Sequence, residues 1–208
     1  MCKKNELPFH FAYRYNHFYL REYIMDNLFS ADFHLFHDKV VEFSKRPWSA
    51  EEQTEKLVEM WNKQVKPKDN VYHLGDFVFM RNKKHIEVLK TLIRRLNGKK
   101  HFITGNHCDS KIWSIINEER DLCEWVKDYD KVIIDNQKVI MCHYAFRTWD
   151  CARYGSFNLY GHSHGNLPPI GKQLDVGIDN SVNVLGEHRL FEWDDIVNFM
   201  KSQEVQIA

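Results

Sequence analysis

The chain has 208 residues, 43% of them hydrophobic, which is enough for one globular domain that needs no disulfide cross-links. Lysine plus arginine equals aspartate plus glutamate at 29 each, so the net charge excludes a general attraction to nucleic acid or to an anionic membrane. The five cysteines show no CxxC spacing, which argues against a disulfide framework and against a thiolate zinc site.

The N-terminal residues are polar, and no apolar run is long enough for a signal peptide or a membrane span. We therefore expect a cytoplasmic protein without a membrane partner. The absence of repeats and linkers predicts one domain over residues 1–208, with residues 1–27 as an N-terminal extension. In that extension Phe9, Phe11, Tyr13 and Tyr15 alternate with other residues. This pattern favours an edge strand or arm over a base-stacking platform or a dimer seam.

Helical patterns and short apolar runs then alternate along the chain. Ser49 and Glu52 form a capping box before a helix that stops near Pro67. A second helix should end at Gly98, and a third should pass through residues 112–116. Strand candidates are residues 28–30, 71–74, 102–104, 132–134, 139–142 and 157–160. Asp135 and Asn136 predict a hairpin between two of these runs, whereas helices separate others. We therefore expect mixed sheets in a layered α/β or α+β fold.

Five of the apolar runs end directly in residues that can bind a metal ion. These groups are Asp32-Phe33-His34, Gly75-Asp76, Gly105-Asn106-His107, His143 and Gly161-His162-Ser163-His164. In layered α/β proteins the loops at the carboxyl ends of the strands form the ligand crevice, so side chains distant in sequence converge there. A single group of this kind is usually a turn or a surface pair, but the ordered set predicts a metal site.

The spacing within two of these groups suits a two-pronged clamp. Residues i and i+2 of an extended segment point the same way, so Asp32 with His34, and His162 with His164, can each grip an ion. Imidazole, carboxylate and amide donors together favour Mn²⁺, with Fe, Zn²⁺ or Ni²⁺ as alternatives, over an all-oxygen Ca²⁺ or Mg²⁺ site. Seven donors exceed one tetrahedral coordination sphere, so we expect two metals and one bridging carboxylate.

The ordered set DxH, GD, GNH, H and GHxH resembles the signature of the calcineurin-like metallophosphoesterase superfamily, particularly its compact bacterial and phage members. The resemblance runs from about Leu28 to beyond Trp193 and is also carried by Arg46-Pro47-Trp48, residues 71–77, Cys142-His143-Tyr144, and residues 161–168 and 174–179. It implies a four-layer α/β/β/α sandwich with two mixed sheets.

The resemblance also implies a role for each donor. One metal would take Asp32, His34 and His164, the other Asn106, His143 and His162, with Asp76 between them. His107 matches the histidine that lies beside the substrate without binding metal. The implied reaction is hydrolysis of a phosphate ester by in-line attack of a metal-bridging hydroxide, with His107 stabilising or protonating the departing oxygen.

Other residues near the motifs have two interpretations each. Arg147, four residues after His143, is either a catalytic clamp on a phosphate oxygen or part of a surface salt bridge. His37 should support the ligands or start a helix, and His73 should be structural. Asp175 and Asp179 would orient the GHxH loop or lie exposed in turns. Cys108 stands where the superfamily has an acid. This leaves open which residue supports His107.

We predict a metal-dependent phosphoric ester hydrolase. Phosphodiesters are favoured because no dense cluster of cationic residues for a dianionic phosphate stands beside the motifs. A phosphomonoesterase or nuclease of the same fold is the first alternative, and a catalytically idle metal-binding scaffold is the second. The substrate would be a phosphate ester, with nucleotides among the candidates. The basic stretch between Arg81 and Lys100 should coat a solvated helix face, so we expect no stable binding of nucleic acid.

Overall fold

The computed structural model describes residues 25–80 and 85–206, and the predicted aromatic arm before residue 25 lies outside this part of the chain. Its first sheet has the strand order β4-β3-β2-β1-β9. These strands are β1 (Asn27–Ser30), β2 (Asn70–Leu74), β3 (Lys99–Ile103), β4 (Trp125–Lys127) and β9 (Phe191–Glu192). Strands β1 to β4 are parallel, whereas β9 pairs antiparallel with β1. The sheet is therefore mixed, as expected.

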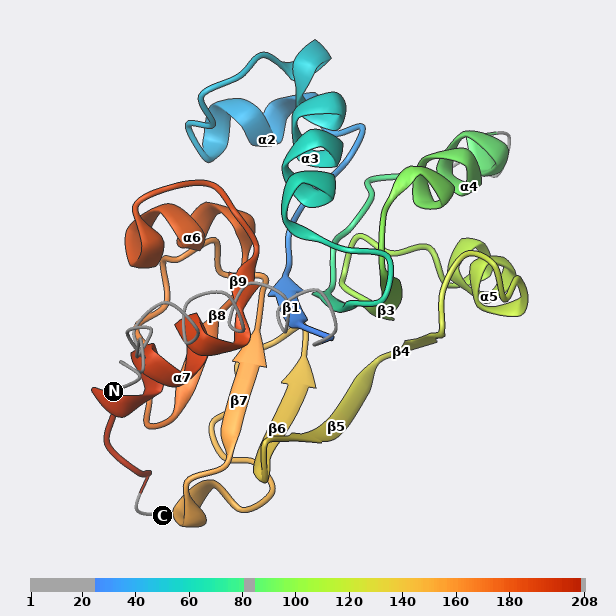
Figure 1. The fold of residues 1–208 in the computed structure, drawn as a ribbon. Coiled ribbons are helices and arrows are strands. Elements are labelled where there is room, and N and C mark those ends of the chain that lie inside the picture. The colour runs from blue at the N-terminus through green and yellow to red at the C-terminus, as the bar shows by residue number, and fades with distance from the viewer. Residues whose placement is uncertain (1–24, 81–84, 207–208) are drawn as a thin grey trace, which may run out of the picture.

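Helices connect the parallel strands of this sheet (Figure 1). Helices α2 (Asp38–Phe43) and α3 (Ala50–Gln64) follow β1, α4 (Ile86–Arg95) follows β2, and α5 (Ser110–Glu118) follows β3. The capping box predicted at the start of α3 is present, with Ser49 and Glu52 bonded to each other's backbone N–H. Helices α6 (Ile178–Leu185) and α7 (Trp193–Lys201) come later in the chain, around β9. No helix of the described residues is both long and apolar enough to cross a membrane.

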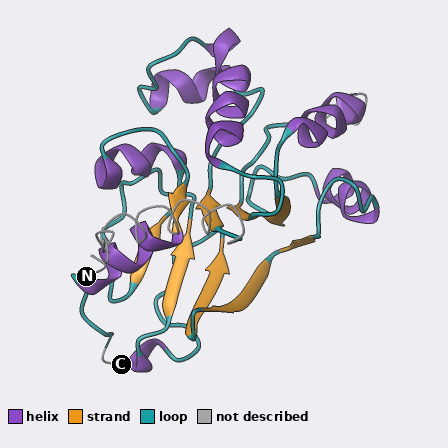
Figure 2. Cartoon of the chain, viewed as in Figure 1, coloured by secondary structure: helices purple, strands orange, loops and turns teal. Residues whose placement is uncertain are grey.

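The second sheet has the order β5-β6-β7-β8, with β5 (Tyr129–Ile134), β6 (Gln137–Cys142), β7 (Phe157–Tyr160) and β8 (Gln173–Asp175). Strands β5 and β6 form the predicted hairpin. Asp135 and Asn136 have φ of 48° and 64°, as a type I′ turn requires. Strands β6, β7 and β8 run parallel to one another. Figure 2 shows the strands in the middle of the molecule with helices around them.

Alternation along the strands sorts the core into layers. In β1, Leu28 packs toward the helices with Trp61 of α3, whereas Phe29 packs toward the second sheet with Met141 and Leu159. On the outer face of the second sheet Ile140 packs against Trp149 and Ala152, next to the short 3₁₀ helix η2 (Ala152–Tyr154). The layered α/β fold class is therefore confirmed, and the facing sheets bring the ends of β1, β2, β3, β6 and β7 together.

Candidate metal centre

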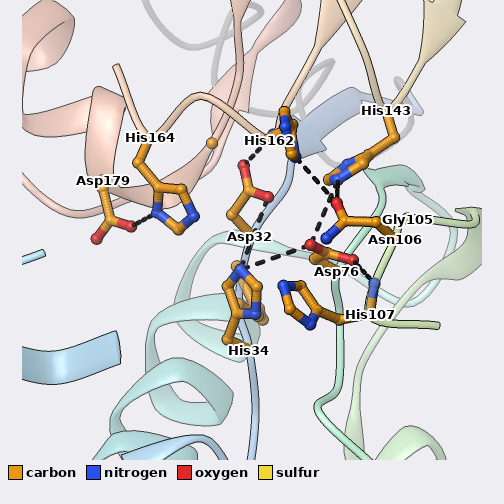
Figure 3. Close-up of polar contacts among 12 residues, drawn as sticks. Asp32, His34, Asp76, Gly105, Asn106, His107, His143, His162, His164 and Asp179 are labelled. Atoms are coloured by element: carbon orange, nitrogen blue, oxygen red, sulfur yellow. Dashed lines mark hydrogen bonds and ion pairs between the residues drawn. The ribbon is translucent and has the colours of Figure 1, made fainter. Parts of the chain in front are cut away.

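All seven predicted donors meet where these strands end (Figure 3). Three overlapping groups have ligand atoms within 4.8 Å of one another. They are Asp32 with His34 and His164, His34 with Asp76 and His107, and Asp76 with His143 and His162. Asn106 joins the last group, because its Oδ1 lies 3.1 Å from His143 Nε2 and 2.9 Å from His162 Nδ1. Loops from both sheets thus contribute to a single cluster.

Asp76 lies in the middle of this cluster (Figure 3). Its Oδ2 is 3.7 Å from His34 Nε2 on one side and 3.3 Å from His143 Nε2 on the other. Its Oδ1 accepts a hydrogen bond of 2.9 Å from the backbone N–H of His107. Burial acts to raise the pKa of Asp76, but the His143 ring and the His107 N–H outweigh it and lower the pKa to about 2. The carboxylate is charged and faces both halves of the cluster.

Five of the proposed ligands have left-handed backbone conformations. The φ angles are 60° for Asp32, 50° for His34, 51° for Asp76, 68° for His162 and 48° for His164. This region costs a non-glycine residue about 1–2 kcal/mol. Such strain is characteristic of functional sites, where surrounding structure holds a side chain in a required direction. Here it turns each chain sharply at the end of its strand and aims the side chain into the cluster.

Two glycines of the motifs are required because the ligands pack directly against them. A Cβ added to Gly105 would lie 2.1 Å from Asp76 Oδ1, and one added to Gly75 would lie 2.1 Å from His143 Nδ1. Gly75 also has φ of +99°, a conformation that side chains rarely adopt. The glycines of GD and GNH therefore allow the loops to approach closely enough to share ligands.

The buried part of the cluster contains polar atoms without hydrogen-bond partners. Asp32 and His34 are almost completely buried. Within the described residues, no hydrogen bond reaches Asp32 Oδ1 or either ring nitrogen of His34. Burial, together with the carboxylates of Asp175, Asp76 and Asp179, raises the pKa of Asp32 well above its usual range. Divalent cations would give these atoms partners and relieve the crowded negative charge. The donor set therefore fits transition-metal ions.

Two imidazoles are held through Nδ1, which leaves Nε2 as the nitrogen that could bind a metal. His143 Nδ1 lies 2.9 Å from the carbonyl oxygen of Leu74, and His164 Nδ1 lies 2.6 Å from Asp179 Oδ2. Both partners are acceptors, so Nδ1 is the donor in each contact, and a metal ion would take the lone pair of Nε2 once that nitrogen is deprotonated. Hydrogen bonds of this kind fix the orientation and tautomer of metal-binding histidines.

Arg46 supports the cluster from behind, a role that the sequence motifs did not reveal. Its guanidinium, with no exposed surface, donates five hydrogen bonds of 2.7–2.9 Å. The acceptors are both carboxylate oxygens of Asp179, the side chain of Gln53 and the carbonyl oxygens of Asp32 and Phe33. Burial acts to raise the pKa of Asp179, but His164 and Arg46 outweigh it and lower it. Arg46 thereby ties the DxH loop to the GHxH loop.

Of the two interpretations of the acids near the GHxH loop, exposed turn carboxylates are wrong, because Asp175 is buried and the side chain of Asp179 is only 7% exposed. Asp175 accepts hydrogen bonds of 2.9 Å from the N–H of Gly165 and 2.7 Å from the N–H of Gly177. Asp179 holds His164 as described. These contacts agree with the interpretation that both residues orient the loop.

The loop after Asn106 rearranges the GNH motif. Asp109 accepts hydrogen bonds from the N–H of Lys111 and Ile112 and so caps α5 instead of supporting His107. Cys108 Sγ accepts from the N–H of Gly105 at 3.1 Å, and burial raises the pKa of this thiol to about 11, which keeps it neutral. The His107 ring centroid lies 5.3 Å from that of His34.

The remaining predicted residues lie around this centre. His37 is the N-cap of α2 and stacks on Phe79 with ring centroids 4.3 Å apart, while His73 is buried within β2. Arg147 is exposed in the loop after β6, and its carbonyl oxygen accepts a hydrogen bond from Gln206. No contact joins the Arg147 guanidinium to the seven donors in the part of the chain that the structure describes.

The chain is similar to a family model and to two curated proteins. Residues 25–171 match the family model described as the calcineurin-like phosphoesterase superfamily domain. An uncharacterized protein of Methanocaldococcus jannaschii is 38% identical over 78 residues, a match that covers 37% of this chain and 43% of that protein. The gene 66 protein of Mycobacterium phage D29 is 25% identical, with 73% of this chain and 86% of the phage protein covered.

Among solved structures, a protein of unknown function from Aquifex aeolicus is similar with a TM-score of 0.61 and 15% identity. The alignment covers 85% of this chain and 100% of the Aquifex protein. At this identity the likeness concerns the fold alone.

Proposed function

Because this chain belongs to the calcineurin-like phosphoesterase superfamily and is a metal-dependent hydrolase of phosphoric esters, we propose that it hydrolyses phosphodiesters at a dinuclear centre around Asp76. The observation that carries this proposal is the contact of one carboxylate with two sets of donors. Asp76 Oδ2 lies within 3.7 Å of His34 Nε2 and 3.3 Å of His143 Nε2. A carboxylate in this position suits a bridge between two ions.

The two sides of Asp76 suggest one metal each. We assign Asp32, His34 and His164 to one ion, and Asn106, His143 and His162 to the other. Imidazole, carboxylate and amide donors favour Mn²⁺, with Fe, Zn²⁺ and Ni²⁺ as alternatives. When bound, two such ions would lower the pKa of a water molecule toward neutrality and neutralise charge on the phosphate.

His107 would act on the substrate from its place beside the centre. Its backbone N–H already holds Asp76 Oδ1, which fixes the residue next to the bridging position. A ring nitrogen of His107 lies within 4.8 Å of ligand atoms of His34 and Asp76, but in this assignment other residues bind the two ions. We propose that the imidazole donates a proton to the departing oxygen.

The charge around the centre supports a diester over a monoester. A dianionic monoester favours a free cation on its oxygens, but the five N–H groups of Arg46 all bond to protein acceptors. Arg147 remains the candidate for such a cation. Lys90, Arg94 and Arg95 of α4 pair with Glu119, Asp121 and Glu55, which supports a solvated helix face and not a nucleic-acid track.

The free thiols of the described cysteines support a reducing compartment such as the cytoplasm.

A metal-reconstituted substrate screen tests the proposal. It compares aryl monoesters, aryl diesters, cyclic nucleotides, and single- and double-stranded nucleic acids, with metal-stripped protein as the control. Turnover of diesters that requires the added metal is expected. If the protein prefers monoesters and Arg147→Ala loses that preference, the diester assignment is contradicted. Cleavage of long nucleic acids would favour the nuclease, and no turnover by protein containing two metals would favour the idle scaffold.

A further inference from the structure

The metal centre opens to solvent beside an exposed aromatic ring. Asp32, His34, Asp76 and His143 are buried, whereas Asn106 and His162 are exposed. Tyr144 follows His143 at the end of β6, and 46% of its surface is exposed. A phosphate that reaches the buried donors from solvent can therefore enter past Asn106 and His162, next to this ring.

The Tyr144 ring has a defined position relative to the proposed ligands. Its centroid lies 5.1 Å from the His143 ring and 4.8 Å from the His162 ring, at interplanar angles of 66° and 64°. Both rings are held, His143 by the Leu74 carbonyl and His162 by the contact of its Nδ1 with Asn106 Oδ1 at 2.9 Å, and the backbone N–H of His162 also bonds to Asp32 Oδ2 at 2.8 Å. These edge contacts hold Tyr144 at the rim while nearly half of its surface stays free.

From this arrangement we propose that Tyr144 is a stacking platform for a planar ring on the substrate. The substrate would then be a phosphodiester that carries a nucleobase, an inference that rests on the proposed function. When the phosphate lies at the His143 and His162 side, one ester group extends toward the rim. Stacking of a base on an exposed aromatic side chain contributes about 1–3 kcal/mol and does not require a particular base.

The test compares two cyclic diesters that share the same five-membered phosphate ring. Adenosine 2′,3′-cyclic phosphate carries a base, whereas glycerol 1,2-cyclic phosphate does not. Tyr144→Ala should lower kcat/KM for the adenosine ester by roughly 5–150-fold, mainly through KM, and leave the glycerol ester nearly unchanged. Tyr144→Phe, which keeps the ring, should retain most of the preference. The matched control is Tyr154→Ala, which removes a tyrosine that is 74% exposed on η2.

Equal losses of kcat/KM on both esters in Tyr144→Ala would overturn the proposal. The same loss in Tyr144→Phe as in Tyr144→Ala would also overturn it, in favour of a role for the hydroxyl group. Loss of metal from Tyr144→Ala would also overturn it, because the ring would then only pack against His162. If the wild type turns over neither ester, the wider substrate screen decides the proposed function, and stacking is still tested by binding. Metal-loaded protein should bind AMP at least about 5-fold tighter than ribose 5-phosphate, and Tyr144→Ala should abolish the difference.

Discussion

The guanidinium of Arg46 donates two parallel hydrogen bonds to Asp179, at 2.8 Å from Nε and 2.9 Å from Nη2, across 133 residues of sequence. Asp179 then accepts a hydrogen bond from His164, and the remaining donors of Arg46 hold the backbone of the DxH loop and Gln53. One buried side chain thus positions the ligands assigned to one metal and contacts none of those assigned to the other. This asymmetry makes the two proposed metal sites experimentally separable.

We expect Arg46→Lys to weaken one metal site selectively. A lysine keeps the charge but cannot reproduce the five-donor fork. Loss of such supporting bonds typically lowers metal affinity by about 10–100-fold, here at the site of Asp32, His34 and His164. Calorimetric titration and elemental analysis should therefore show one tight and one weakened ion. Arg189→Lys, which alters a comparable bidentate pair with Asp195, is the control. Equal weakening of both sites would contradict the assignment.

Asp76→Asn should reduce metal occupancy more than Asp32→Asn does. Replacement of the central carboxylate removes charge that would attract both ions, whereas Asp32 faces only one group of donors. Titration with Mn²⁺ should show both sites weakened in the first variant and one in the second. If Asp76→Asn holds two ions with wild-type affinity, Asp76 is not the bridge.

Removal of metal should reverse the effect of Asp32→Asn on stability. Asp32 is buried beside three other carboxylates, and its folded-state pKa is raised above the unfolded value. Folding without metal therefore takes up a proton between these two values, so stability falls as the pH rises through that window. At neutral pH, metal-free Asp32→Asn should be more stable than metal-free wild type, because asparagine removes a charge that burial and the neighbouring carboxylates disfavour. With Mn²⁺ present, the wild type should be the more stable protein.

Thermal and denaturant unfolding with and without a chelator measure these differences. The comparison needs all four combinations of variant and metal, since only the change of sign separates charge crowding from a packing defect. A lower stability of Asp32→Asn in both states would show that the carboxylate mainly supports the loop.

His107→Ala should retain both metals and lose turnover in a manner that depends on the leaving group. A proton donor matters most when the departing oxygen is a poor leaving group, so the loss on alkyl or nucleoside esters should be roughly 10²–10⁴-fold. Nitrophenyl esters should lose less. Equal losses across a leaving-group series would indicate charge stabilisation or positioning, and loss of a metal would make His107 a ligand.

The sequence predicted the elements and donors that have strong local signals. Strand β7 matches the predicted residues, and the run of residues 28–30 became β1 with one residue added. The short strands β4, β8 and β9 escaped detection because two or three residues are too few to show a strand pattern. Gly98 has the predicted positive φ of 81°, but α4 ends earlier, with Leu96 as its cap.

Contacts that support the donors were harder to predict for the same reason. The role of Arg46 depends on Asp179, whose position relative to it follows only from the packing of α6 near the DxH loop. The insertion of Cys108 left the partner of His107 open, and the start of α5 at Ser110 makes the following Asp109 a helix cap. Whether the seven donors bind metal as proposed remains a prediction.

Because the donors come from loops of both sheets, the centre depends on the order in which the chain is synthesised. Asp32 leaves the ribosome 132 residues before its proposed partner His164, and Asp179 follows later still. Domains generally fold as units, so the centre needs every loop that supplies a ligand. A nascent chain that ends after β3 carries only Asp32, His34 and Asp76 of the seven proposed ligands. Hydrolytic activity should accordingly appear only after the GHxH loop has emerged, so metal loading would follow the synthesis of the last ligand.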